Sequence, residues 1–299
     1  MIVGGPGGIG PTAHYTAHVW ARNGLSHPEL ATWRGRVMFE ALRPVMCMSG
    51  ALGGPTLEAH LLARHHAIDV LLRRLIDSEE ASQVVELACG LSPRGWRFAG
   101  DHGDRLTYVE ADLPAMAQRK REALRRLGSL SATHRVASVD VLEPAGEHSL
   151  EQLVSTLKPE AGLIVITEGL LGYLQRPALE GLWARIASQL ERFSVGHYLS
   201  DLHLASGAGR AVDAFRLALG VFVGASVPLH HFSERGEAQD ALRRAGFTSA
   251  IVADARDPGG GAALRHDGDG LTCVLHARVA HASPRAPGRP APAQQGLRS

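Results

Sequence analysis

Cysteine is scarce in this chain, with three residues among 299 and no Cys-x-x-Cys pair. Cys47, Cys89 and Cys273 lie far apart, which argues against a disulfide framework or a zinc knuckle and favours a reducing, cytoplasmic setting. The paired histidines have no acidic or cysteine partner at ligand spacing, so we expect no metal. The histidines at 65–66 and 230–231, and His14 with His18, are instead expected to be solvated or capping.

Long hydrophobic runs and an excess of charge are also missing. The longest apolar runs, such as residues 163–166, have the length of a strand, so no transmembrane helix is expected. The first residues, Met-Ile-Val-Gly-Gly-Pro, lack the basic and apolar regions of a secretory signal. A formal net charge of +1 gives no reason to expect nucleic acid or a membrane as partner. Hydrophobic residues still make up 45% of the chain, enough for a sizeable core.

The first part of the chain has helical periodicity without strand-like alternation. Residues 1–10 are rich in glycine and predict a flexible leader, and residues 11–81 predict a helical cap. Helices are expected at residues 11–22, 28–42 and 56–76. The third carries the clearest apolar face, formed by Leu57, Leu61, Ile68, Leu71, Leu72 and Leu75.

From residue 82 to 279 the pattern predicts one α/β domain. We expect strands at 84–87, 106–110, 134–139, 162–166 and 195–199, with a loop between the first two and helices at 114–127, 149–157 and 177–192. This alternation is typical of a doubly wound, mostly parallel sheet. Runs at 247–253 and 271–276, around glycines 259–261, predict an antiparallel edge pair. Residues 205–228 predict an insertion near the active site, and residues 283–299 a disordered tail.

Acidic residues follow the predicted strands, at the edge where parallel sheets bind ligands. Asp112, Asp140 and Glu168 are spaced by 28 residues, about one βα repeat, and Glu86 ends the first strand. A glycine loop at Gly90 followed 22 residues later by an acid is typical of a site for the ribose hydroxyls of an adenosine cofactor. The alternative is that each carboxylate only caps the helix that follows it.

The loop at residues 88–95 helps to choose between adenosine cofactors. It reads Ala-Cys-Gly-Leu-Ser-Pro-Arg-Gly and lacks the G-x-G-x-x-G spacing that holds the pyrophosphate of NAD or FAD. S-adenosylmethionine (SAM) has no phosphate and needs a close backbone approach, an acceptor for its ammonium and a donor for its carboxylate. We therefore predict SAM. A nicotinamide-dependent oxidoreductase and a non-catalytic SAM-binding protein remain the alternatives.

Four segments carry a family resemblance. Residues 63–69 pair Ala-Arg with Ile-Asp, and residues 84–97 read Val-Val-Glu-Leu-Ala-Cys-Gly-Leu-Ser-Pro-Arg-Gly-Trp-Arg. Residues 108–114 read Tyr-Val-Glu-Ala-Asp-Leu-Pro, followed by Lys120, and residues 167–174 read Thr-Glu-Gly-Leu-Leu-Gly-Tyr-Leu. In this order, over roughly residues 64–198, they resemble the leucine carboxyl methyltransferase family, including its bacterial polyketide O-methyltransferase-like members. The resemblance implies a class I SAM-dependent methyltransferase with a Rossmann-like sheet.

The resemblance also implies roles for the matching positions. Arg64 would bind the SAM carboxylate, Gly90 would line the methionine, and Asp112 would hold the ribose hydroxyls. The remaining cofactor candidates are Asp140 and Val141 at the adenine, Glu168 at the ammonium or sulfonium, and Glu86. The family's first loop usually continues Gly-x-Asp-Thr-Arg, whereas this chain has Ser-Pro-Arg at residues 92–94. That departure argues against the family's protein phosphatase substrate.

For the acceptor we expect a carboxylate or hydroxyl oxygen of a small molecule, such as a secondary metabolite, methylated by in-line displacement. Tyr15 and Tyr198 are candidate substrate contacts. Tyr173, Asp201 and His203 are the candidate catalytic residues, with His203 as a base oriented by Asp201. A carboxylate is already ionised at neutral pH and needs no base, whereas a hydroxyl does. Both kinds of acceptor stay open, as does the oligomeric state.

Overall fold

The computed structural model describes residues 10–51, 56–205, 231–258 and 272–280. Four predicted features therefore lie wholly or almost wholly outside the described residues: the leader, the insertion at 205–228, the glycines at 259–261 and the tail at 283–299. Over the described ranges, the helices are too short or too polar to span a lipid bilayer.

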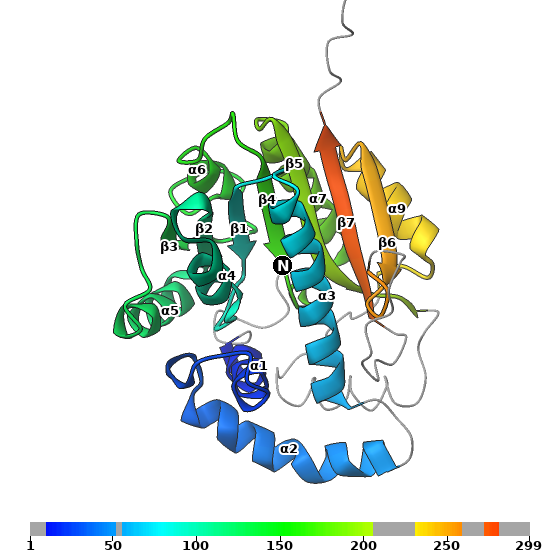
Figure 1. Ribbon diagram of the computed structural model, residues 1–299. Coiled ribbons are helices and arrows are strands. Elements are labelled where there is room, and N and C mark those ends of the chain that lie inside the picture. Colours follow the sequence, from blue (N-terminus) through cyan, green and yellow to red (C-terminus); the bar gives the residue numbers. More distant parts are fainter. Residues whose placement is uncertain (1–9, 52–55, 206–230, 259–271, 281–299) are drawn as a thin grey trace, which may run out of the picture.

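Seven strands form one sheet in the order β3-β2-β1-β4-β5-β7-β6 (Figure 1). All neighbours are parallel except β7, which runs antiparallel to both β5 and β6. The predicted doubly wound, mostly parallel sheet with an antiparallel pair at one edge is thus confirmed. The strands are β1 Gln83–Leu87, β2 Thr107–Asp112, β3 His134–Ser138, β4 Leu163–Thr167, β5 Val195–His203, β6 Ser249–Asp254 and β7 Thr272–Ala280.

Helices cover both faces of the sheet, which is why β1 and β4 are buried along their whole length. Successive side chains of a strand point to opposite faces, so Val84 packs under α3 (Leu57–Asp77) and α4 (Arg94–His102), while Val85 packs with the helices behind. Those are α6 (Leu150–Val154), α7 (Arg176–Leu190) and α9 (Arg235–Arg244), whereas α5 (Pro114–Arg126) packs against β2 and β3.

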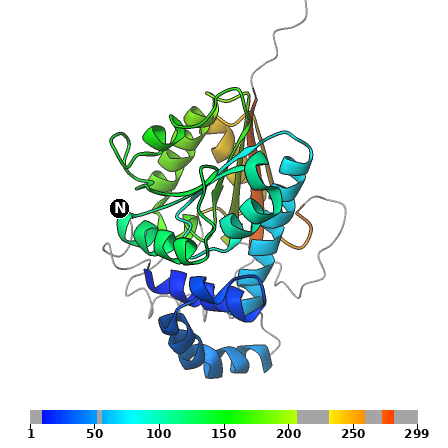
Figure 2. The ribbon, with the colours of Figure 1, turned by 60° about the vertical axis from the view of Figure 1, so that its left-hand side comes forward.

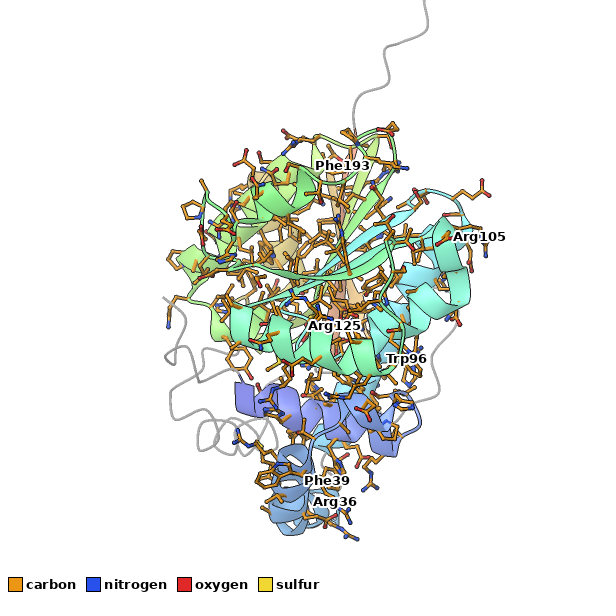
Figure 3. All side chains as sticks on the ribbon, turned by 90° about the vertical axis from the view of Figure 1, so that its left-hand side faces the viewer. Arg36, Phe39, Trp96, Arg105, Arg125 and Phe193 are labelled. Atoms are coloured by element: carbon orange, nitrogen blue, oxygen red, sulfur yellow. The ribbon has the colours of Figure 1, made fainter. Side chains whose placement is uncertain are left out.

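The helices α1 (Gly10–Arg22) and α2 (Trp33–Ala51) lie beyond the carboxyl ends of the parallel strands (Figures 1 and 2). The long helix α3 joins this region to the sheet: Leu61 packs with Tyr15 of α1, and Ile68 packs against the sheet. Thr56 caps α3, because its Oγ1 accepts a hydrogen bond from the Ala59 amide at 3.1 Å. Figure 3 shows Phe39 of α2 at one end of the molecule and Phe193 at the other.

The structure corrects the expected helix at residues 28–42. Residues Pro28–Leu30 form a 3₁₀ turn, after which Ala31 is extended and α2 begins at Trp33. The break follows from a local cap, since Thr32 Oγ1 accepts a hydrogen bond from the Gly35 amide at 3.1 Å.

Two further helices were not predicted. The expected loop between the first two strands contains α4, and α9 precedes β6. Both are short and mostly polar, and each buries only three residues, so neither contains an apolar run that marks a helix in the sequence. The strand β5 is also four residues longer than expected. It carries Asp201 and His203 within the sheet rather than in a following segment.

Candidate active site

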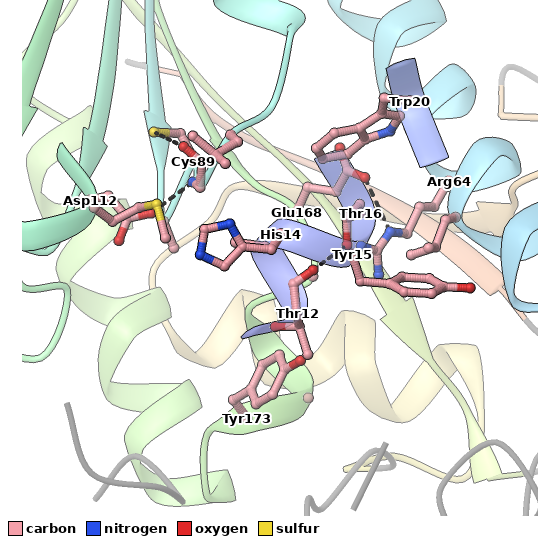
Figure 4. A pocket seen from close by; sticks show the side chains of 18 of the residues that line it. Thr12, His14, Tyr15, Thr16, Trp20, Arg64, Cys89, Asp112, Glu168 and Tyr173 are labelled. Carbon is pink, nitrogen blue, oxygen red and sulfur yellow. Dashed lines mark hydrogen bonds and ion pairs between the residues drawn. The ribbon is translucent and has the colours of Figure 1, made fainter. Parts of the chain in front are cut away.

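A cavity of about 460 Å³ lies between α1, α2, α3 and the carboxyl ends of the parallel strands (Figure 4). Its volume is in the range of small-molecule sites. Eight predicted site residues line it: Tyr15, Arg64, Gly90, Asp112, Glu168, Tyr173, Asp201 and His203. The lining does not include the other four, which are Glu86, Asp140, Val141 and Tyr198.

Asp112, the last residue of β2, fastens the turn after β1. Its Oδ2 accepts a hydrogen bond from the Gly90 amide at 2.7 Å, and its Oδ1 accepts one from the Leu113 amide at 2.7 Å. Burial raises the pKa of Asp112, although these two amides oppose the change. Each carboxylate oxygen has two lone pairs, so the group can accept further hydrogen bonds.

Gly90 is required by its backbone and by its neighbour. Its φ is +52°, a conformation that side chains disfavour, and a Cβ there would lie 3.2 Å from the Cβ of Ala13 in α1. The close approach of α1 to this turn closes the cavity on the side of Asp112.

Arg64 of α3 connects the acids at the ends of β4 and β5. Its Nε donates to Glu168 Oε1 at 3.1 Å, and its Nη1 donates to Asp201 Oδ2 at 3.4 Å (Figure 4 shows Arg64 beside Glu168). Asp201 Oδ1 also accepts a hydrogen bond from the Gly169 amide at 2.7 Å. Burial opposes the charge of Arg64, but Asp201 and Glu168 outweigh it and raise its pKa. These two contacts account for two of the five N–H groups of the guanidinium.

Behind Glu168 lies Arg94, which is completely buried. Its Nε donates to Asp69 Oδ1 at 2.6 Å, its Nη1 to Glu86 Oε1 at 2.7 Å and its Nη2 to Glu168 Oε2 at 2.6 Å. His65 Nδ1 lies 2.9 Å from Glu168 Oε2. Burial opposes ionisation of Glu168, but His65 and Arg94 hold its pKa well below the usual range. One guanidinium thus gathers carboxylates from α3, β1 and the end of β4.

Sequence reasoning gave no role to Arg94 or His65. The available signal was that Arg94, Asp69, Glu86 and Glu168 all stand in the segments that carry the family resemblance. The paired histidines were expected to be solvated or capping. His14, His65 and His231 are buried rather than solvated, whereas His18 and His66 are partly exposed and His230 lies outside the described residues.

Two predicted residues belong to the interior rather than to the cavity. Glu86 Oε2 accepts a hydrogen bond from the Tyr108 hydroxyl at 2.8 Å, and Glu86 Oε1 accepts one from Arg94. Both carboxylate oxygens are thus bound by interior residues. Tyr198 is completely buried, and its hydroxyl lies 2.7 Å from Thr167 Oγ1. The expected substrate contact of Tyr198 therefore has no support, because the ring lies in the core of the sheet.

Asp140 and Val141 follow β3 in a turn outside the cavity lining. Asp140 Oδ1 accepts a hydrogen bond from the Leu142 amide at 2.9 Å, and the Val141 carbonyl accepts one from Arg185 at 2.7 Å. The carboxylate of Asp140 thus stabilises a local turn, a role similar to the capping role that was the alternative to cofactor binding for the acids after the strands.

The other side of the cavity holds two histidine rings. His203 Nε2 lies 3.7 Å from Asp201 Oδ2, on the same side of β5. The ring of His203 stacks on that of His60 from α3, with centroids 4.9 Å apart and an interplanar angle of 27°. His60 was not predicted, since a lone histidine on an apolar helix face gives no signal. Tyr173 is hydrogen-bonded to the Thr12 side chain of α1.

Two simpler findings concern Cys89 and metals. Cys89 is buried, and burial raises the pKa of its thiol well above its usual value. Across the described ranges, no group of three or more His, Cys, Asp or Glu side chains is arranged to hold a metal ion.

Comparison with solved structures identifies the fold. A proposed methyltransferase from Thermobifida fusca YX is 13% identical, with a TM-score of 0.64 over 90% of this chain and 94% of that one. A DUF574 family protein from Streptomyces avermitilis MA-4680 is also 13% identical, with a TM-score of 0.61 over 89% and 96%. For PigF with SAH, 14% identical at a TM-score of 0.48, the match covers 71% of this chain and 54% of that longer one.

Sequence comparison identifies the family. The curated proteins give no match to this chain. The family model for leucine carboxyl methyltransferase matches residues 31–187, which is just over half of the 299 residues. That range contains Arg64, the Gly90 turn, Asp112 and Glu168. The chain belongs to the leucine carboxyl methyltransferase family of SAM-dependent methyltransferases.

Proposed function

We propose that this chain transfers the methyl group of SAM to a carboxylate or hydroxyl oxygen of a small molecule. The observation that carries the proposal is the cavity in which Asp112, the Gly90 turn, Arg64 and Glu168 meet at the carboxyl ends of parallel strands. In this proposal, residues 82–279 form the SAM-binding domain and residues 11–81 form a cap over it.

The residues present fit SAM. At the Gly90 turn the methionine part of SAM can lie close to the backbone. Asp112 has lone pairs left that can accept hydrogen bonds from the ribose hydroxyls. Arg64 retains N–H groups for the SAM carboxylate beyond its contacts with Glu168 and Asp201. Glu168 is held ionised by its neighbours, so it can attract the ammonium. When bound, SAM supplies a methyl group on a positively charged sulfur, which is already highly reactive.

The protein then contributes alignment and exclusion of water. Helix α1 covers the cavity and supplies Tyr15, while Tyr173, Asp201 and His203 line it from the sheet side. Burial raises the pKa of Tyr15 to about 12, so its phenol stays protonated and can donate a hydrogen bond to an acceptor. A hydroxyl acceptor would need a base such as His203, and a carboxylate would not.

Calorimetry with S-adenosylhomocysteine tests the cofactor site. Asp112→Ala removes two charge-assisted hydrogen bonds, so we expect a loss of about 2–5 kcal/mol in binding free energy. Arg64→Lys should also weaken binding, because a point charge cannot replace the planar fork. Asp101→Ala and Arg73→Lys are matched controls, since this ion pair lies on the surface.

Two outcomes would contradict the proposal. One is unchanged affinity in both site variants, with the fold intact by circular dichroism. The other is tight binding of NAD in place of S-adenosylhomocysteine, which would favour the oxidoreductase alternative.

A further inference from the structure

The stacked rings of His60 and His203 come from two different elements and meet at the cavity wall. His60 lies on α3, one turn before Arg64, and His203 is the last residue of β5. Their ring planes are 27° apart at a centroid distance of 4.9 Å, so the pair is close to parallel. Both residues line the cavity, and His60 is only 9% exposed. A stack of this kind fixes the orientation of both rings.

The charges around the two rings favour a base over a binding site for an anion. Asp201 Oδ2 lies 3.7 Å from His203 Nε2, where it stabilises an imidazolium. Among the described residues of the cavity lining, Arg64 is the cation that contacts Glu168 and Asp201, and its charge is already shared between them. The negative charges of Glu168 and Asp201 would repel a carboxylate acceptor, whereas they would not repel a neutral hydroxyl. The same cavity lining contains further charged or titratable groups, among them Arg64, Glu168, Asp201, Tyr15 and Tyr173.

The remainder of this side of the cavity is apolar. Residues of α2 and α3 supply four aliphatic side chains to the lining, namely Met38, Leu42, Leu57 and Leu61. The other cations of the lining, Arg34 and Arg119, are exposed, so solvent and salt screen their charges. Apolar walls with a few convergent polar groups are typical of sites for uncharged small molecules.

We propose that His60 and His203 form a paired site that receives the proton of a hydroxyl group on an apolar acceptor. His203 is the accepting residue, and His60 is a positioning residue that holds its ring against the cavity. This inference rests on the proposed methyl transfer and selects a hydroxyl over a carboxylate as the methylated group.

The proton balance of the step follows from the chemistry of the acceptor. Methylation of a hydroxyl joins its oxygen to the methyl carbon and leaves the electron pair of the broken methyl–sulfur bond on sulfur. The hydroxyl proton is released, and His203 takes it up at a ring nitrogen. Asp201 then faces an imidazolium instead of a neutral ring, which lowers the free energy of the charged state.

The test uses the full chain with bound S-adenosylhomocysteine and two probes that share a skeleton, 2-naphthol and 2-naphthoate. Histidine ring signals are followed by NMR and assigned with His60→Phe and His203→Phe. We expect 2-naphthol to shift the signals of both rings and 2-naphthoate to shift neither. Absence of any effect of 2-naphthol, or an equal effect of the carboxylate, overturns the inference. Failure of S-adenosylhomocysteine to bind would instead overturn the proposed function.

Methyl transfer from labelled SAM to 2-naphthol separates the two histidines. We expect kcat to fall by about 10²–10⁴-fold in His203→Ala, with loss of the rise in rate across the histidine titration range. His60→Ala should lower kcat by about 10–100-fold while KM stays within about twofold, because the variant loses only the fixed orientation of the His203 ring. His60→Phe restores the stack and should recover most of the rate.

A matched control is His18→Ala, which removes an imidazole packed on Phe39 in α2 and outside the cavity lining. It should leave kcat and the pH profile unchanged. A His60→Ala variant that matches the wild type, or a His60→Phe variant as slow as His60→Ala, contradicts the positioning role. Methylation of 2-naphthoate in preference to 2-naphthol contradicts the choice of a hydroxyl.

Discussion

Two clusters of buried charge hold the segment after β1, and only one of them reaches the cavity. The Arg94 cluster consists of Arg94 with Asp69, Glu86, Glu168 and His65. The Lys120 cluster consists of Glu110 of β2, Lys120 of α5 and His134 of β3. The charged side chains of both clusters are almost completely withdrawn from solvent, Glu168 being 5% exposed and the other members less than 10%.

The Lys120 cluster lies away from the cavity lining. Lys120 pairs with Glu110 and donates to the Ser92 carbonyl, and His134 Nε2 lies 2.9 Å from Glu110 Oε1. A Cβ at Gly95 would overlap the Glu110 carboxyl, so α4 can pass over the cluster only with glycine there. None of these charged groups lines the cavity.

The Arg94 cluster ends at a ligand site instead. Glu168 belongs both to the cluster and to the cavity lining, and through Glu168 the cluster contacts Arg64. A change at Arg94 therefore reaches the residues proposed to hold SAM, whereas a change at Lys120 should affect only the stability of the fold. Buried charges can serve either purpose, and their connection to the cavity distinguishes the two.

The largest effect is expected for Arg94→Met. Removing this guanidinium leaves Asp69, Glu86 and Glu168 buried without their main partner, so the free energy of unfolding should fall by about 3–5 kcal/mol. Urea unfolding measures this loss, and calorimetry at low temperature should show weaker binding of S-adenosylhomocysteine. If the free energy of unfolding fell by less than about 1 kcal/mol and S-adenosylhomocysteine bound normally, the proposed difference between the two clusters would be wrong.

A somewhat smaller effect is expected for Lys120→Met. Glu110 keeps His134 as a partner, so we expect a loss of about 3 kcal/mol, at the lower end of the range for a broken buried pair. Where the variant is folded, its affinity for S-adenosylhomocysteine should equal that of the wild type. Lys158→Met at an exposed site is the control and should change stability by less than about 0.5 kcal/mol. Loss of binding in a folded Lys120→Met protein would show that this cluster also serves the ligand site.

The smallest effect is expected from acid. Burial opposes ionisation of Glu168 and Asp69, but His65 and Arg94 hold the pKa of each below its usual value. Lys120 does the same for Glu110. Their stabilisation is present above the unfolded pKa of about 4 and is lost as the pH falls from there through the lower folded pKa.

Between pH 5 and pH 3 we therefore expect the free energy of unfolding to fall by on the order of 1–2 kcal/mol. The pKa of Asp112, which burial raises, acts in the opposite direction. Urea unfolding across this range should give a shallower decline in Arg94→Met, because the lowered pKa values of Glu168 and Asp69 depend on Arg94. A decline parallel to that of the wild type would show that Arg94 does not set them.

The sequence predicted the parallel sheet because its signal is local. Apolar runs of strand length alternate with helical repeats, and this pattern does not depend on distant contacts. The glycine turn and Asp112 were found in the same way, since a βα unit places both at one edge of the sheet. The short helices α4 and α9 were missed because each buries only three residues, and the 3₁₀ turn at Pro28–Leu30 was missed because it depends on a local cap by His27.

What the sequence alone determined is the order of the elements, the family and the acids at the strand ends. Tertiary structure decided which of those acids line the cavity. Asp112 and Glu168 line it, whereas Glu86 pairs with Arg94 and Asp140 accepts a hydrogen bond from the Leu142 amide. The pairing of His60 with His203 and the convergence on Arg94 join residues 143 and 74 positions apart in the chain. Such contacts depend on how α3 crosses the sheet, because packing and the need to pair buried charges bring these residues together, and no spacing along the chain encodes them.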